Sequence, residues 1–381
     1  MRTLPNTILS AIFIGLACAS CQSSTETYRG GERATVTPSK QEIQLSMAAT
    51  TDRAEPHMAA VLTALQSLDP KPIQSLSANE ARHQPTVADA VMKVLDRKGL
   101  SKSPQPVGKI ENVSIPGPGG SIPIRVYTPS GSGPFPIVVY SHGGGWVMAT
   151  IDTYDASARA LSNAANAMVM SVEYRKAPEH RFPAAHEDAF AAYTWARLHG
   201  QDINGDPSRV AVAGESAGGN LAGAVALMAR QKSIGLPVHQ ILIYPVTGYD
   251  PDTPSYREHA QAQPLNKDMM GWFFEKYLNS PADARSPLIA LVQAPDLNGL
   301  PPATIITAEI DPLESDGKLY AERLRRAGVP VTYRSFHGLT HEFFGTGAVV
   351  PEAVEAVQLA GRELKQSFTL SDRPRRPPVH Q

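Results

Sequence analysis

The regular alternation of short apolar runs with segments of helical period most constrains the fold of this chain. Five runs are typical of buried strands: Ile137–Tyr140, Met168–Val172, Val210–Ala213, Gln240–Tyr244 and Thr304–Thr307. Helical segments follow them at Tyr154–Ala167, Glu187–His199, Ala217–Arg230, Lys318–Ala327 and Pro351–Phe368. The pattern predicts an α/β fold, a mostly parallel central sheet flanked by helices on both faces, with right-handed crossovers.

Three segments lie outside this alternation, two before it and one within it. The runs Val113–Ile115 and Ile122–Tyr127 flank a Gly-Pro-Gly-Gly turn and predict an antiparallel hairpin at the sheet edge. Residues 56–105 are helical in pattern, and residues 247–287 form a long, Pro-rich insertion. The length of the second segment predicts a lid over a site, within one domain that spans residues 56–370.

The amino-terminal residues 1–19 are typical of an export signal. Arg2 supplies positive charge, and the apolar run Ile8–Ala17 is too short to span a bilayer. Cleavage after Ala19 fits an A-x-A pattern, and a lipoprotein signal with the lipid on Cys21 or Cys18 is the alternative. An exported protein is predicted: periplasmic, secreted or anchored to a membrane as a lipoprotein.

Composition limits the partners and the chemistry. Residues 20–55 are rich in Ser, Thr, Gln and Gly and predict a flexible tether, and residues 371–381 predict a disordered tail. A formal net charge of −1 gives no footprint for nucleic acid. Both cysteines lie within the first 21 residues, so a disulfide, a cysteine nucleophile or a cysteine-rich metal site is not expected in the body.

A Gly-Glu-Ser-Ala-Gly sequence at residues 214–218 joins a predicted strand to a predicted helix. This is the setting of a nucleophile elbow, where glycines leave room for a tight turn and the hydroxyl of Ser216 stands exposed. A Gly-rich strand-to-helix turn without chemistry is the alternative. The strand before it and the helix after it favour Ser216 as a nucleophile.

A second glycine run, His-Gly-Gly-Gly-Trp at residues 142–146, follows the strand Ile137–Tyr140. Its backbone amides are unobstructed by side chains, so they can point at a developing oxyanion. Gly143, Gly144 and Gly145, with the amide of Ala217, are therefore the candidate oxyanion hole. A phosphate-binding loop is disfavoured, because no Lys-Ser/Thr pair follows and the Gly spacing fails at residue 148.

A serine nucleophile needs a base and a carboxylate that orients the base, in the chain order Ser, Asp/Glu, His for this kind of elbow. Asp311 follows the strand Thr304–Thr307, and His341 follows the strand Val331–Phe336. Both fall on loops at the carboxyl ends of strands, where α/β sheets place their sites. Alone, such an Asp is more often a turn residue and such a His a surface or core residue. Their order after Ser216 favours them.

Metal chemistry is not expected from the sequence. His341-Glu342 begins like the zincin H-E-x-x-H motif, but Gly345 stands where the second histidine belongs.

Taken together, the motifs resemble those of the bacterial hormone-sensitive-lipase-like esterases, a family of α/β hydrolases. The resemblance runs from about His57 to the last helix. It rests on five motifs in family order: His-Gly-Gly-Gly-Trp at 142–146, Tyr-Arg-Lys-Ala-Pro-Glu-His at 174–180, Gly-Glu-Ser-Ala-Gly-Gly-Asn at 214–220, Tyr244-Pro245 and Asp311-Pro312-Leu313.

The resemblance implies an α/β-hydrolase fold with a helical cap from about residues 56–105 and 247–287, no cofactor, and a small-molecule ester as substrate. It implies that Ser216 is the nucleophile, His341 the general base and Asp311 its orienting acid, for short-to-medium acyl esters. Trp272 and Phe273 would line the acyl site, although cap packing is the alternative for either.

Three departures from the family pattern lie near the predicted site. Glu215 replaces the usual Asp before the serine, and Glu342 replaces the Gly that often follows the histidine. Ser315 and Asp316 replace the usual Asp two residues after Leu313, which leaves Asp316 as a rival to Asp311. Two other functions remain open on the same fold. One is a catalytically silent small-molecule binder, against which the presence of His341 argues. The other is an amide or lactone hydrolase, since fold and triad do not determine the leaving group.

Overall fold

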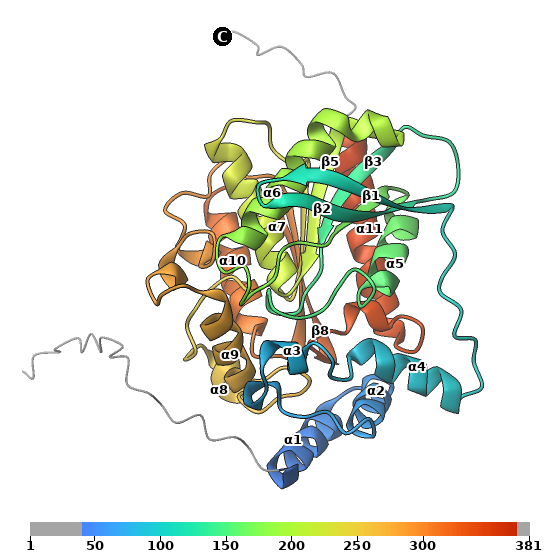
Figure 1. Ribbon diagram of the computed structural model, residues 1–381, viewed down its shortest axis with the longest axis vertical. Helices are drawn as coiled ribbons and strands as arrows, with labels where there is room; N and C mark the ends of the chain where they lie inside the picture. The colour runs from blue at the N-terminus through green and yellow to red at the C-terminus, as the bar shows by residue number, and fades with distance from the viewer. Residues whose placement is uncertain (1–39, 372–381) are drawn as a thin grey trace, which may run out of the picture. The chain divides into compact units, whose positions relative to one another are not determined.

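A computed structural model describes residues 40–371, and within them one eight-stranded sheet forms the centre of the protein (Figure 1). The strands are β1 Lys109–Gly117, β2 Gly120–Thr128, β3 Phe135–Ser141, β4 Met168–Val172, β5 Gly205–Glu215, β6 Gln240–Ile243, β7 Ala303–Ile310 and β8 Val331–Thr340. Their order across the sheet is β1-β2-β4-β3-β5-β6-β7-β8. Strands β3 to β8 run parallel to one another. At one edge, β2 pairs antiparallel with β4, and β1 pairs antiparallel with β2.

The helices are α1 Lys40–Arg53, α2 Pro56–Gln66, α3 Ala78–Ala81, α4 Val87–Arg97, α5 Asp155–Ala165, α6 Ala184–His199, α7 Ala217–Gln231, α8 Pro254–Glu258, α9 Lys267–Tyr277, α10 Glu314–Arg326 and α11 Pro351–Ser371. Within residues 40–371, no helix is both long enough and apolar enough to cross a membrane.

Alternating residues of the inner strands build two cores, one on each face of the sheet. In β3, Ile137 and Val139 belong to the core beneath α6 and α7, whereas Val138 and Tyr140 belong to the core beneath α5 and α11. Figure 1 shows α5 and α11 on one side of the sheet and α6, α7 and α10 on the other. The predicted α/β fold with helices on both faces is confirmed.

The hairpin at the sheet edge forms as the sequence predicts. Gly117 pairs with Gly120 at the turn, and Ile115 pairs with Ile122 in the ladder between β1 and β2. Helix α10 begins at Glu314, four residues ahead of the predicted start at Lys318. Its first turn holds the acidic residues Glu314 and Asp316, which suit a helix amino terminus but carry no apolar periodicity.

The predicted tether at residues 20–55 is wrong for its second half, because residues 40–53 form helix α1. Among the α1 side chains that the structure describes, only Met47 and Thr50 are buried. A helix that buries so little shows almost no apolar period, which is why the composition favoured a tether. The predicted export signal at residues 1–19 and the tail beyond Ser371 lie outside the described residues.

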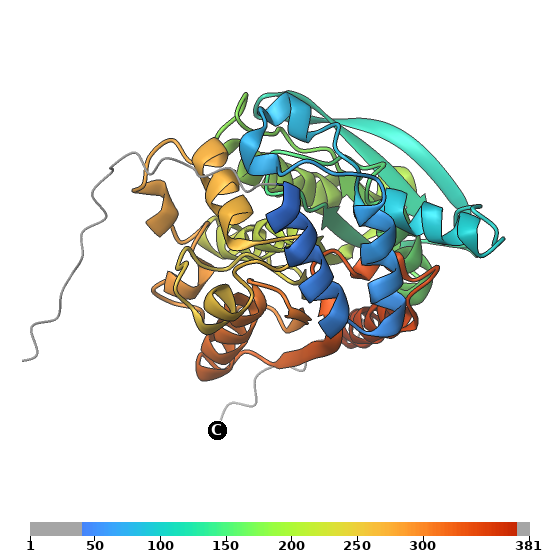
Figure 2. The same ribbon diagram turned by 90° about the horizontal axis from the view of Figure 1, so that it is seen from below.

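Helices α1 to α4, α8 and α9 lie together at one end of the sheet, and we call them the cap (Figures 1 and 2). Helix α1 is joined to the insertion around α8: Arg53 pairs with Glu258 at 3.1 Å, and Gln263 Nε2 donates to Ser46 Oγ at 3.3 Å. Helix α9 also contacts the short turn Ile73–Ser75. The two helical segments outside the strand–helix alternation therefore meet in space, although about 155 residues of sheet and helix separate α4 from α8 in sequence.

Candidate active site

Ser216 stands at a sharp turn between β5 and α7, with φ 56° and ψ −118°. The turn closes because two glycines allow backbone to meet backbone. A Cβ on Gly214 would lie 2.1 Å from the carbonyl oxygen of Gly218, and a Cβ on Gly218 would lie 2.0 Å from that of Ser141. The amide of Ser216 donates to Ile243 O of the neighbouring β6 at 2.9 Å. This is the strained elbow that the sequence predicts.

The three residues predicted as a triad come together at the carboxyl ends of β5, β7 and β8. His341 Nε2 lies 2.9 Å from Ser216 Oγ, and His341 Nδ1 lies 2.6 Å from Asp311 Oδ2. Asp311 is fully buried, and its Oδ1 accepts the amide of Leu313 at 2.9 Å. The carboxylate is therefore held at both oxygens, one on the backbone and one on the imidazole.

The electrostatics of His341 come from burial and from carboxylates around it. Burial lowers the pKa of His341, but the charge and hydrogen bond of Asp311, followed by the charges of Glu342 and Glu215, more than offset it. The pKa of His341 therefore lies above its ordinary value, so this imidazole is a stronger base than a free one.

Asp316, the rival carboxylate, binds backbone amides and not His341. Its Oδ2 accepts the amides of Thr247 and Gly248 at 3.0 and 2.9 Å, which holds the chain where it leaves β6. Burial raises the pKa of Asp316 to about 7. The hydrogen bond to His341 is made by Asp311, so the structure separates the two candidates.

The glycine run lies beside Ser216 with its backbone open. Gly144 and Gly145 have φ of 93° and 60°, a region that favours glycine, and both line the cavity that holds Ser216. Within residues 40–371, their amides donate no hydrogen bond, and the amide of Ala217 is the first of α7, where intrahelical partners are lacking. Gly143 does not line the cavity, because the hydroxyl of Tyr154 packs against it.

The cavity has a volume of about 340 Å³ and lies between the body and the cap. Ser216 and His341 form part of its floor. Both cap segments line it, with Leu65, Ile73 and Val87 from the first and Leu265, Met269 and Phe273 from the second.

Of the two aromatic residues predicted to line the acyl site, one lines the cavity and the other does not. Phe273 lines the cavity and packs on the glycine run, since a Cβ on Gly145 would lie 2.1 Å from its ring. Trp272 does not line it. Its ring packs edge-on against Phe273 with centroids 5.4 Å apart, and Lys276 lies over it. Neighbouring residues on a helix point about 100° apart, so only one of the pair faces the cavity.

Sequence reasoning missed Arg82, a cap residue that also lines the cavity. Its guanidinium donates to Val147 O at 2.8 Å and to Ala177 O at 2.7 Å, and it pairs with Glu179 at 2.6 Å. It thereby ties the cap to the segment after the glycine run and to the Tyr-Arg-Lys-Ala-Pro-Glu-His motif. A lone arginine between two short helices carries no local signal of such contacts.

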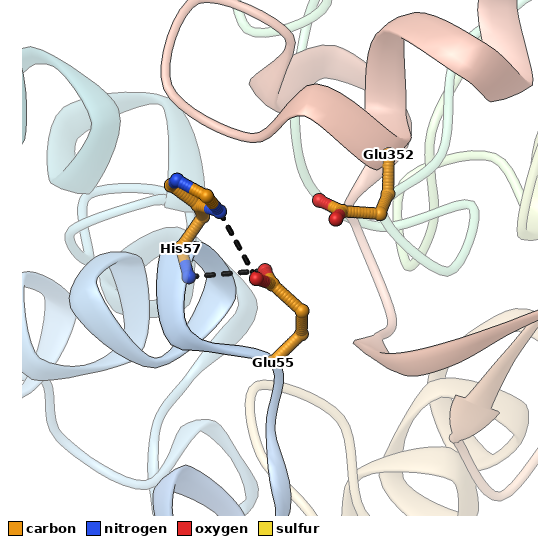
Figure 3. Close-up of side chains that lie close together, drawn as sticks. All are labelled: Glu55, His57 and Glu352. Carbon is orange, nitrogen blue, oxygen red and sulfur yellow. Dashed lines mark hydrogen bonds and ion pairs between the residues drawn. The ribbon is translucent and has the colours of Figure 1, made fainter.

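One group of side chains in residues 40–371 has the residue types and spacing of a metal site (Figure 3). Ligand atoms of Glu55, His57 and Glu352 all lie within 4.8 Å of one another. Glu55 already caps α2 by accepting the amide of His57 at 3.0 Å, and Glu352 lies in the first turn of α11, where a carboxylate is favoured. None of the three lines the cavity of Ser216, so the group stands apart from the triad.

The fold and the serine elbow together define the α/β-hydrolase class. Residues 138–345 match the family of that fold. The chain is 42% identical over 262 residues to the carboxylic ester hydrolase LipN of Mycobacterium tuberculosis, covering 65% of this chain and 70% of that one. It is 41% identical over 293 residues to the carboxylesterase NlhH of the same organism, covering 74% and 91%.

Among solved structures, an esterase of Pyrobaculum calidifontis is 37% identical, with a TM-score of 0.71 over 79% of this chain and 96% of that one. The chain therefore belongs to the hormone-sensitive-lipase-like carboxylesterase family of α/β hydrolases. It is a carboxylic ester hydrolase.

Proposed function

We propose that the protein hydrolyses short-to-medium acyl esters through a covalent acyl-enzyme on Ser216. The observation that carries the proposal is the unbroken chain of contacts from Ser216 Oγ to His341 to Asp311, at 2.9 and 2.6 Å, on the floor of a cavity. Both relatives described above are named for ester hydrolysis.

In the first half of the reaction, His341 Nε2 takes the proton of Ser216 as Oγ attacks the ester carbonyl carbon. Asp311 holds the proton of Nδ1, so that Nε2 is the free acceptor, and stabilises the imidazolium that forms. The amides of Gly144, Gly145 and Ala217 receive the oxyanion of the tetrahedral intermediate, with Gly143 shaping the loop. His341 then gives its proton to the leaving alcohol oxygen.

In the second half, water enters the place that the alcohol has left. His341 takes a proton from this water, whose oxygen attacks the acyl carbon and forms a second tetrahedral intermediate at the same donors. Collapse of that intermediate breaks the bond to Oγ, returns the proton to Ser216 and releases the carboxylic acid.

The cavity supports the expected substrate size. Its volume of about 340 Å³ lies near the lower end of the range for small-molecule pockets. Its cap side is apolar at Leu65, Ile73 and Phe273, which suits a hydrocarbon chain of limited length.

The test is hydrolysis of p-nitrophenyl esters from acetate to palmitate by the intact protein, by Ser216→Ala and by the control Ser103→Ala. Ser103 is exposed and lies before β1, so its loss should leave the rates unchanged. The proposal requires that short and medium esters turn over and that Ser216→Ala alone loses the activity. Equal rates for Ser216→Ala and the intact protein would overturn it.

Two alternatives share this site. A silent binder would turn over no ester in the series. An amide or lactone hydrolase would prefer p-nitroanilides or lactones to the matched esters, because the same triad serves those leaving groups. Rates on the three substrate types, with one acyl chain, rank these functions against ester hydrolysis.

For localisation we propose export, with a lipid on Cys21 as the anchored form. The support is sequence alone, namely the charged and apolar residues of 1–19 and the small residues around Cys21. Fractionation of cells that express the full chain beside Cys21→Ser tests it. An anchored wild type with a released variant supports the proposal, and retention of both in the cytoplasm contradicts it.

A further inference from the structure

The side chain of Glu342, the residue after His341, is partly buried and lines the cavity. Its Oε1 accepts a hydrogen bond of 2.6 Å from the hydroxyl of Tyr154. Among the described residues, no donor contacts Oε2. One oxygen of this carboxyl is thus held in place, and the other is free to accept a hydrogen bond from a bound molecule.

The backbone conformation of Glu342 is unusual for a glutamate. Its φ is 67°, in the left-handed region that favours glycine. A glutamate there strains the backbone, and such strain gathers at functional sites. The contact with Tyr154 holds the side chain despite this, since Tyr154 is itself wedged against Gly143 of the glycine run.

Beyond Glu342 lies a second cavity of about 40 Å³. The hydroxyl-bearing residues Thr153 and Ser157 and the carboxyl-bearing Glu215 line it. It shares five lining residues with the main cavity: Thr86, Val87, Thr153, Tyr154 and Glu342. The smaller cavity is therefore a side pocket, large enough for one small polar group, because a water molecule occupies about 30 Å³ in the liquid.

Glu215 does not compete for a donor in this side pocket. Both of its oxygens are already taken, one by the hydroxyl of Tyr140 and the other by that of Tyr244. Of the two carboxyl groups that line the side pocket, Glu342 is the one with an open acceptor.

We infer that Glu342 is a specificity-determining residue, which favours esters whose alcohol part carries a hydroxyl group a few bonds from the ester oxygen. The inference rests on the proposed function, in which His341 protonates the leaving alcohol. The alcohol part must therefore pass beside His341, whose chain neighbour presents the free Oε2. A hydroxyl at the entrance of the side pocket donates to this oxygen, whereas a methyl group in the same place leaves it unpaired.

The test compares 2-hydroxyethyl butanoate with propyl butanoate, which differ by a hydroxyl in place of a methyl. We expect the intact protein to prefer the hydroxyl ester by about tenfold in kcat/KM. In Glu342→Gln the amide oxygen accepts from Tyr154 and the NH2 group takes the place of Oε2, so no acceptor faces the substrate hydroxyl. Glu342→Gly removes both oxygens and suits the backbone, and each variant should bring the ratio close to one. Glu355→Gln, an exposed glutamate on α11, is the matched control and should keep the preference.

A ratio that is the same in the intact protein and in both Glu342 variants overturns the inference. Circular dichroism and Tm show that each variant folds, and Glu342→Gly covers the case in which Gln packs poorly. Failure of the proposed function is a different result, because Ser216→Ala would then hydrolyse both esters like the intact protein.

Discussion

The inner strands of the sheet and the helices of the cap are packed in different ways. Every residue of β4 is buried, and so is every residue of β7 except Glu309. In α1, by contrast, most of the described side chains are exposed. The strands hold Ser216 and Asp311 within hydrogen-bond distance of His341. The cap lines the cavity with apolar side chains such as Phe273 beside polar ones such as Gln84.

This difference assigns chemistry to the body and substrate fit to the cap. A close-packed body tolerates little change in volume, and the reacting atoms depend on its geometry. The cap is held on the body by apolar packing, in which α2 and α4 share one core with the strands, and by directed contacts, of which those of Arg82 are the clearest. Changes in the body should therefore abolish activity or folding, and changes in the cap should adjust binding.

The largest effect is expected from Asp311→Asn in the body. The amide cannot hold His341 in the tautomer that frees Nε2, so kcat should fall by about 10⁴-fold with the fold intact. Stopped-flow or steady-state kinetics on a short p-nitrophenyl ester measures it. Asp316→Asn is the control and should keep kcat within about tenfold, since Asp316 bonds to backbone amides of Thr247 and Gly248. The opposite ranking of the two variants would refute the assignment.

A matched pair of glycines sharpens the comparison between body and cap. In Gly218→Ala the new Cβ would lie 2.0 Å from Ser141 O, so we expect a loss of more than about 3 kcal/mol in the free energy of unfolding. Gly271 is exposed in α9 with no atom within 4 Å of a new Cβ, so Gly271→Ala should gain about 0.5–1 kcal/mol. Urea unfolding of both measures the difference. Equal changes in the free energy of unfolding for the two variants would contradict the difference between body and cap.

The contact between cap and body is tested by Arg82→Ala. Its guanidinium is largely buried and donates to two backbone carbonyls, so its loss should cost about 1–2 kcal/mol of stability. Because the cap lines the cavity, KM should rise more than kcat falls. Arg326→Ala removes an exposed ion pair with Glu322 and serves as control. A fall in kcat at constant KM would instead place Arg82 in the chemistry.

The smallest effect is a pH shift in Glu342→Gln. The carboxylates of Asp311, Glu342 and Glu215 raise the pKa of His341, so removing one negative charge should lower it. His341 must be neutral to act as a base, hence the acid limb of the kcat/KM profile should move to lower pH. An acid limb at the same or a higher pH would show that Glu342 is uncharged in that pH range or does not act on His341.

The sequence predicted the body far better than the cap, and for physical reasons. Strands such as Met168–Val172 are buried on both faces, so their apolar runs are visible locally, and the turn around Ser216 requires glycine. Helix α1 was missed because its burial depends on partners around residue 260, far away in sequence. Arg82 and the orientation of Trp272 depend in the same way on tertiary packing, which no local pattern contains.

The most direct test of the central claim is to label the protein with an alkyl fluorophosphonate, in which a nucleophile displaces fluoride and forms a stable phosphonyl ester. Peptide mass spectrometry should find the adduct on Ser216, with loss of esterase activity in proportion, and Ser216→Ala should remain unlabelled. Labelling of another residue with loss of activity, or full activity in a protein labelled at Ser216, would contradict the account.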